Sequence, residues 1–271
     1  MQLQGAKQRF EAQGIKLAAI SYDTPAILKE FADRHKIEYP LLADPKSKII
    51  ASYGALNPDA TGMMKGMALP GYYYADANGI IREQYFEAKY TDRFTANNVL
   101  AKLFPELAEQ VTQKLAASHL GLELGQSDRA VAPGSRFNLA VHVELPHDTH
   151  VYAPGVKGYK PIQLELDSSP EVQLMPPNYP ASKILYLEAI KEEVAVFEGR
   201  FRITSDAKIS ASPDFIKSLG TIGKTITISG QLSYQACDKT ICYPPTSVLV
   251  NWQLEILPLD RQRSPEAIQH E

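Results

Sequence analysis

The sequence has 271 residues, and a usual domain length of about 150 residues predicts two domains. Hydrophobic residues make up 44% and charged residues 22% of it, a globular composition that argues against a disordered, collagen-like or membrane protein. The formal net charge of -3 comes without a Lys/Arg-rich block, so nucleic acid is not an expected partner.

Residues 1–117 alternate between helical and extended segments, which is typical of an α/β domain. Thr24 is a predicted helix N-cap, with Pro25 at the first helical position. The elements expected in this half are, in chain order, a helix over 3–13, a strand over 15–21, the helix that starts at Pro25, a strand over 39–42, a helix near 47–53, a loop over 57–67, strands over 71–75 and 80–85 joined by an Asn-Gly turn, and a helix from about 91 to 115.

Past residue 121 the sequence changes to short runs rich in Val, Ile, Tyr and Phe that Pro and Gly interrupt. The predicted strands cover 137–145, 162–166, 172–175, 184–187, 194–203, 225–235 and 247–256. This number of short strands predicts an antiparallel β-sandwich of two sheets over residues 120–258. Residues 259–271 are polar and are expected to form a flexible tail.

Cys237 and Cys242 are the two cysteines of the sequence, and they flank the short connection 238–241 between two strand-like runs. A four-residue hairpin loop would place them opposite each other, with Cα atoms about 4.5 to 5.5 Å apart. A disulfide accepts Cα separations of about 4.4 to 6.8 Å, so a bond can form and break there without backbone movement. The polar connection indicates exposure, which thiol-disulfide exchange requires.

Three other interpretations of the cysteine pair stay open at this point. A structural staple would stabilise the fold by only roughly 2 kcal/mol, because the ring it closes is so small. Two free core cysteines are the second interpretation, although the polar neighbours argue for a surface turn. The third is a zinc site that His147 and His150 would complete, with a wider spacing between the cysteines than zinc sites usually have.

Two motifs around the cysteines resemble the active-site hairpin of the DsbD family, in the N-terminal domain of these transmembrane thiol-disulfide reductases. They are YQAC at residues 234–237 and CYPP at 242–245. The segments HVYAPG at 150–155 and VFEG at 196–199 look like an early Tyr-containing segment and the cap loop of that domain. The likeness extends over roughly residues 120 to 257.

The resemblance implies an immunoglobulin-like fold for the sandwich and thiol-disulfide oxidoreductase activity at the hairpin. Cys237 and Cys242 would be the catalytic residues. Phe197 matches the position of the aromatic cap-loop residue that covers the disulfide in that family until a partner docks. The remaining residues expected to support the active site are Tyr152, Tyr234 and Tyr243.

The first half resembles a peroxiredoxin of the AhpC/TSA class, through residues 15–54 and 69–81. This resemblance implies a thioredoxin-like α/β fold. Such domains carry their peroxidatic cysteine, and a central strand of the sheet, ahead of the helix that opens this chain. We therefore expect residues 1–117 to be a truncated, incomplete domain without peroxidase activity. Pro70 matches either the cis-proline of thioredoxin-like folds or an ordinary proline at the start of a strand.

The combined prediction is a thiol-disulfide oxidoreductase that uses neither a cofactor nor a metal. Its expected partners are other thiol-disulfide proteins, namely a DsbD-type membrane reductase and thioredoxin-like or peroxiredoxin clients. The resemblance implies a periplasmic or other extracytoplasmic location, although residues 1–17 lack the features of a signal peptide. No apolar run reaches the roughly 20 residues that cross a bilayer, so direct membrane insertion is not expected.

Two alternative functions stay open. One is a peroxiredoxin-type antioxidant protein in its full-length form, which would need a cysteine upstream of residue 1. The other is a non-catalytic β-sandwich interaction module in which the disulfide is structural.

Overall fold

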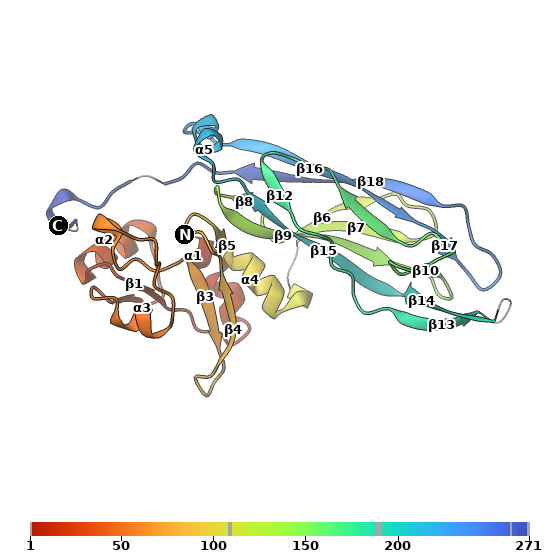
Figure 1. The fold of residues 1–271 in the computed structure, drawn as a ribbon, viewed down its shortest axis with the longest axis horizontal. Helices are drawn as coiled ribbons and strands as arrows, with labels where there is room; N and C mark the ends of the chain where they lie inside the picture. The colour runs from red at the N-terminus through yellow and green to blue at the C-terminus, as the bar shows by residue number, and fades with distance from the viewer. Residues whose placement is uncertain (1, 108–109, 188–190, 261, 270–271) are drawn as a thin grey trace.

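The computed structural model describes residues 2–107, 110–187, 191–260 and 262–269. The chain is a mixed α/β protein made mostly of β-sheets, with most of its helices in the N-terminal part (Figure 1). The helices are α1 (Gln2–Glu11), α2 (Pro25–His35), α3 (Lys48–Ser52), η1 (Gly62–Met64), α4 (Ala96–Leu103), η2 (Pro105–Leu107), α5 (Pro213–Leu219) and η3 (Glu266–Ile268).

The N-terminal part contains two small sheets. Its strands are β1 (Ala19–Ser21), β2 (Leu41–Ala43), β3 (Gly71–Ala75), β4 (Ile81–Phe86) and β5 (Arg93–Phe94). Within the described residues β1 pairs in parallel with β2, while β3 and β4 form a separate antiparallel hairpin. Gly71 lies against the ring of Phe86, where a Cβ atom would clash. Helices α1 and α4 pack together through Phe10 and Leu100.

Local signals placed several of these elements correctly. Thr24 caps α2, with its hydroxyl accepting a hydrogen bond from the Ile27 amide, and Pro25 begins the helix as predicted. The Asn-Gly turn joins β3 and β4, and Gly79 has a φ of 78°. There is no cis peptide bond within the described ranges, so Pro70 is an ordinary proline before β3.

The predicted helix over 91–115 is wrong beyond Leu103. Pro105 lacks an amide hydrogen and clashes with a preceding turn, so α4 ends before it. Residues 110–115 instead form strand β6, which pairs with the first strand of the sandwich. The apolar spacing of four residues in this segment therefore did not indicate a helix. The division of the chain into domains at residue 117 stays a prediction.

The described residues of the C-terminal part form three sheets. Its strands are β6 (Gln110–Leu115), β7 (Gly121–Gln126), β8 (Ala130–Val131), β9 (Ser135–Glu144), β10 (His150–Tyr152), β11 (Gln163–Leu166), β12 (Val172–Leu174), β13 (Lys183–Leu187), β14 (Glu192–Glu198), β15 (Arg200–Ile209), β16 (Lys224–Tyr234), β17 (Ala236–Cys237) and β18 (Thr246–Ile256). One main sheet has the order β12-β15-β9-β7-β6, with β5 on β9, and the other has the order β11-β16-β18-β8. Both contribute to one hydrophobic core.

The third sheet, β13-β14-β10-β17, connects the two main sheets at the end far from the helices (Figure 1). The run over 194–203, predicted as one strand, is two strands because Gly199 takes a φ of 64° between β14 and β15. Strand β14 is thus the extension of β15, and β17 is the extension of β16. The short strand β10 pairs with both of them. Cys237 lies in this third sheet.

Polar contacts join α4 to the sandwich. The Asp206 carboxylate on β15 accepts hydrogen bonds from Lys102 and Asn98 of α4, at 2.8 and 3.2 Å, and from Asn138 of β9. Burial would raise the pKa of Asp206, but the Lys102 ammonium and the two amides outweigh burial and lower it below its ordinary value. The carboxylate of Asp128 is also buried here, and burial raises its pKa.

Asp206→Ala is expected to lower the free energy of unfolding by about 2 kcal/mol, because it leaves a partly buried ammonium and two amides without their acceptor. Urea denaturation of the full chain measures this. The matched control is Glu144→Ala, whose ion pair with Arg200 is largely exposed and contributes less than about 1 kcal/mol. Equal losses in the two variants would contradict the structural importance of the Asp206 contacts.

The C-terminal segment 259–271, predicted as a flexible tail, contacts α2 in its described part. Asp260 lies 3.6 Å from His35, and the Ser264 hydroxyl donates to Glu30. None of the helices in the described ranges is long and apolar enough to span a bilayer.

Candidate functional site

Cys237 and Cys242 are joined by a disulfide at the end of the third sheet. They face each other as an isolated antiparallel bridge, with Cα atoms 4.0 Å apart, somewhat closer than predicted. Cys237 is buried in β17, with 1% of its surface exposed, whereas Cys242 is exposed. An incoming thiolate therefore has access to the Cys242 side of the bond.

The turn between the cysteines is organised by the carboxylate of Asp238. It accepts hydrogen bonds from the amides of Thr240 and Ile241, at 2.7 and 2.9 Å, and from the Thr240 hydroxyl. Its other oxygen accepts from the hydroxyl of Tyr243, at 2.8 Å. Together these hydrogen bonds hold the pKa of Asp238 well below its ordinary value, and the bond from the Thr240 hydroxyl has the largest effect. The conformation of the turn is therefore stabilised by hydrogen bonds that converge on one carboxylate.

Asp238→Ala is expected to speed hydrogen exchange at the amides of Thr240 and Ile241, which lose their acceptor. In the wild type the same loosening is expected as the pH falls below about 4. A carboxylate whose folded pKa is lowered contributes stability above its unfolded pKa and loses it on protonation. Exchange measured by NMR checks both effects. Asp76→Ala, which removes the equivalent acceptor from the β3–β4 turn, is the control and should leave these two amides unchanged.

Tyr152 lies against the disulfide. Its hydroxyl oxygen is 3.6 Å from the sulfur of Cys242 and 3.6 Å from that of Cys237. Burial raises the pKa of Tyr152, so the hydroxyl stays protonated and able to donate. The Tyr152 ring stacks on Tyr159, with centroids 4.3 Å apart, and the Tyr159 hydroxyl donates to Glu192. Tyr152 therefore contacts the disulfide, and Tyr159 supports the Tyr152 ring from behind.

Phe197 does not cover the disulfide, contrary to the prediction. Strand β10 pairs with β14 so that Val151 is opposite Phe197 and Tyr152 is opposite Val196. Side chains alternate between the faces of a strand, so Phe197 projects to the face away from Tyr152 and the cysteines. It is 4% exposed and stacks on Phe201 in the main core. The face that carries the disulfide instead has Val194 and Val196 on β14.

Of the other two predicted tyrosines, Tyr234 lies in the core and Tyr243 lies next to Cys242. Tyr234 is buried in the main core, and its hydroxyl donates to the Ser118 carbonyl, so it stabilises the strand that leads to the turn. Tyr243 follows Cys242 directly. Its ring stacks on His119 with centroids 3.7 Å apart, and its amide donates to the Ala236 carbonyl. Tyr243 therefore helps to hold the turn closed.

His150, which the sequence suggested as a zinc ligand and as part of the HVYAPG segment, lies in the same sheet as Cys237. It is buried and directly opposite Cys237 on one side and Glu198 on the other. Burial lowers the pKa of His150, and the carboxylates of Glu198 and Asp238 oppose that effect. The alternation of His150 and Tyr152 along β10 was the available signal, since residues i and i+2 share a face.

The zinc interpretation of the cysteines receives no geometric support. His147 has a side chain that is 92% exposed, and its Nδ1 atom lies 2.9 Å from the Asp148 carboxylate. Asp148 in turn pairs with Lys239 of the turn at 2.8 Å. Within the described ranges no group of three or more His, Cys, Asp or Glu side chains is placed to hold a metal ion.

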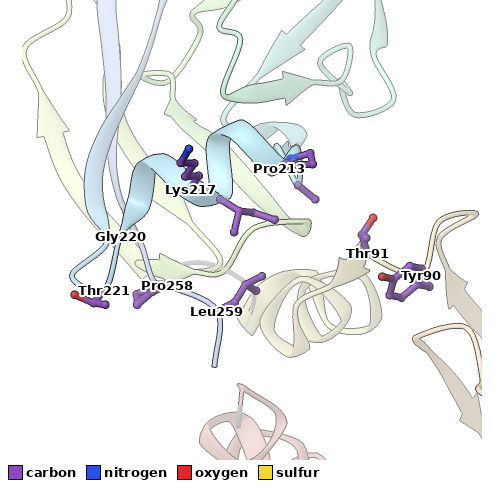
Figure 2. Close-up of a pocket in the computed structure, with 10 residues that line it drawn as sticks. Tyr90, Thr91, Pro213, Lys217, Gly220, Thr221, Pro258 and Leu259 are labelled. Atoms are coloured by element: carbon purple, nitrogen blue, oxygen red, sulfur yellow. The ribbon is translucent and has the colours of Figure 1, made fainter. Parts of the chain in front are cut away.

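A separate cavity of about 920 Å³ lies beside α5 (Figure 2). Its lining comes from α5, from Pro258 and Leu259 after the last strand, and from Tyr90 and Thr91 before β5. Neither cysteine contributes to it, and β17, which contains Cys237, lies at the end of the sandwich away from α5 (Figure 1).

Comparison with known families matched two regions of the chain. Residues 123–253 match the family described as thiol:disulfide interchange protein DsbD, N-terminal, and residues 1–84 match the AhpC/TSA family. The two resemblances inferred from the sequence are thereby confirmed. The comparison with curated proteins found no match.

Several solved structures are similar to parts of the chain, among them the following three. The N-terminal periplasmic domain of ScsB from Proteus mirabilis is 11% identical over 54% of this chain and 51% of that one, with a TM-score of 0.36. The reduced DsbD N-terminal domain from Neisseria meningitidis is 13% identical over 44% of this chain and 81% of that one, with a TM-score of 0.29. A family 123 glycoside hydrolase from Clostridium perfringens is 11% identical over 54% and 28%, with a TM-score of 0.28. The match to ScsB spans about half of that domain.

Proposed function

We propose that this protein exchanges thiols and disulfides with partner proteins through Cys237 and Cys242. The observation that carries the proposal is the asymmetry of the bond, which joins an exposed cysteine residue to a buried one across a tight turn. Exchange proceeds by attack of a thiolate along an accessible approach to a sulfur. The match of residues 123–253 to the DsbD N-terminal family supports the same chemistry.

Reduction of the protein begins when a partner thiolate attacks the Cys242 sulfur. A mixed disulfide forms, and Cys237 leaves with the electron pair of the broken bond and takes up a proton. The second thiol of the partner then attacks the partner's own sulfur in the mixed disulfide and expels Cys242 as a thiolate. Two electrons pass to the cysteine pair, and the partner becomes a disulfide. Reaction with an oxidised client runs through the same steps in reverse.

Tyr152 is proposed to support the sulfur that leaves in each step. Its protonated hydroxyl lies 3.6 Å from both sulfur atoms in the oxidised protein, so one group can donate to a thiolate on either cysteine. Tyr243 supports the site indirectly through Asp238 and the turn. Tyr234 contributes only through the core beneath β16 and β17.

The same resemblances support a finer description of the architecture. Residues 120–258 are proposed to form an immunoglobulin-like sandwich, and residues 1–117 a peroxiredoxin-related, thioredoxin-like unit. Strand β6 pairs with β7, so the sandwich sheet extends N-terminal to residue 120. The polar segment 259–271 follows as a tail.

The proposed partners are dithiol and disulfide proteins, including a DsbD-type membrane reductase and thioredoxin-like or peroxiredoxin clients. An extracytoplasmic location, such as the periplasm, is proposed because disulfides persist in oxidising compartments and because residues 123–253 match the DsbD N-terminal family.

A structural disulfide in an interaction module is the alternative that the burial of Cys237 favours. Peroxidase chemistry would need a further cysteine, because the sequence contains only these two. A redox titration of the full chain with mass-spectrometric trapping of thiols separates exchange from a staple. An exchanging pair is expected to equilibrate with thiol buffers, whereas a potential below about -300 mV would indicate an inert structural bond.

A further inference from the structure

We propose that Glu198, His150 and Cys237 act together, with the His150 imidazole taking the proton of the Cys237 thiol when Cys237 resolves a mixed disulfide. The inference rests on the proposed function and concerns the step after Cys242 has attacked an oxidised client and formed a mixed disulfide with it. Its basis is the strand register. His150 of β10 lies opposite Glu198 of β14 and opposite Cys237 of β17, so the three residues form one row across the sheet.

All three side chains of this row lie on the same face. Directly paired residues of antiparallel strands share a face, with Cβ atoms about 4.5 to 5.5 Å apart. Tyr152, two residues along β10 from His150, is on that face too, because its hydroxyl reaches both sulfurs. The rings of His150 and Tyr152 are in edge contact, with centroids 5.4 Å apart. The imidazole is therefore next to the ring that lies against the disulfide.

Because Cys237 is buried, its thiol needs a nearby proton acceptor before it can resolve the mixed disulfide. Cys237 is 1% exposed, so bulk water has poor access to its proton once the disulfide is open. The thiolate is the attacking species, and an ordinary thiol, with a pKa of about 8.5, is mostly protonated at pH 7. The Nε2 atom of His150 is buried and has no hydrogen-bond partner among the described residues. A neutral imidazole with a vacant nitrogen can accept the proton.

The charges around His150 allow it to hold that proton. Burial lowers the pKa of His150, so the ring is neutral at pH 7 before the transfer. Glu198 and Asp238 favour the charged imidazolium once it forms, as does the thiolate itself. Four groups face the His150 ring: Glu198 from β14, Cys237 from β17, Asp238 from the turn and Tyr152 from β10. The Glu198 carboxylate also pairs with the Lys183 ammonium of β13 at 3.5 Å.

The Cys237 thiol gives its proton to His150, and the thiolate attacks the Cys242 sulfur. The new bond joins the two cysteines, while the bond from Cys242 to the client breaks and the client sulfur leaves with its electron pair. The imidazolium then loses its proton, which the client thiolate takes up through solvent.

The experiment mixes the reduced full chain with 5,5'-dithiobis(2-nitrobenzoate) and follows thionitrobenzoate release by absorbance. The first release reports attack by Cys242, and the second reports resolution by Cys237. In His150→Gln the second phase is expected to slow about tenfold at pH 7 and to match the wild type at pH 9, where the thiol ionises without help. The first phase should be unchanged. His147→Gln, which alters an exposed histidine nearby, should behave as the wild type.

An unchanged second phase in His150→Gln, or equal slowing at pH 7 and pH 9, would overturn the proposal. If that variant does not fold, the pH dependence of the second-phase rate in the wild type tests the proposal instead. A second phase that keeps its rate from pH 9 to pH 7 supports the proton transfer, whereas a fall of about tenfold per pH unit below about 8.5 refutes it. A wild-type protein that releases one equivalent or none would contradict the proposed function itself, and this inference with it.

Discussion

Cys242→Ser is expected to reduce exchange activity by at least about a thousandfold, as removal of a nucleophile does in other enzymes. It leaves Cys237, which is buried and presents no accessible sulfur to a partner. Cys237→Ser is expected to abolish turnover as well, but with a different product. It leaves the exposed Cys242, which can still form a mixed disulfide, while no second cysteine remains to resolve it.

The two variants are distinguished by mass spectrometry after incubation with a thioredoxin that keeps one active-site cysteine, activated as its mixed disulfide with thionitrobenzoate. The Cys242 thiolate attacks the thioredoxin sulfur, thionitrobenzoate leaves with the electron pair of the broken bond, and no second cysteine is present on either protein to resolve the complex. A stable covalent complex should accumulate with Cys237→Ser and be absent with Cys242→Ser. Both variants lack the disulfide and should unfold at similar urea concentrations, each about 2 kcal/mol less stable than the wild type, so a difference in stability between them does not explain a difference in product. Complex formation through Cys237 alone would show that the buried sulfur is the one attacked and would reverse the assignment.

Phe197→Ala is expected to lower the free energy of unfolding by about 3 to 5 kcal/mol, the usual result of removing a large aromatic side chain from a core. The Phe197 ring is buried against Phe201 in the main core, on the face of β14 away from the disulfide. Under native conditions the rate at which dithiothreitol reduces the disulfide should stay the same. Urea denaturation and a thiol-trapping time course measure the two quantities.

Tyr159→Ala is the matched variant, because Tyr159 stacks on the tyrosine that contacts both sulfurs. It should speed reduction of the disulfide while lowering stability less than Phe197→Ala, since Tyr159 is only partly buried. The opposite pattern, with faster reduction and little loss of stability in Phe197→Ala, would restore the cap role predicted from the DsbD family.

Short-range signals in the sequence were sufficient for several features. The cap at Thr24, the proline after it and the Asn-Gly turn all depend on a few adjacent residues, and the structure contains them as predicted. The pairing of Cys237 with Cys242 is of the same kind, because four intervening residues restrict the chain to a turn. The helix predicted through Pro105 was wrong because proline ends a helix, whatever the spacing of the apolar residues that follow it.

Residues 237–242 were enough to predict that the two cysteines lie opposite each other across a turn, because four intervening residues leave the chain little choice. They did not show that Cys237 is buried while Cys242 is exposed. Tertiary structure decided which groups surround them. A shift of one position along a strand moves a side chain to the other face, so only the register of β10 against β14 and β17 could put Phe197 in the core and align Glu198 and His150 with Cys237. These pairings join residues far apart in the chain, and packing of the whole sandwich selects them.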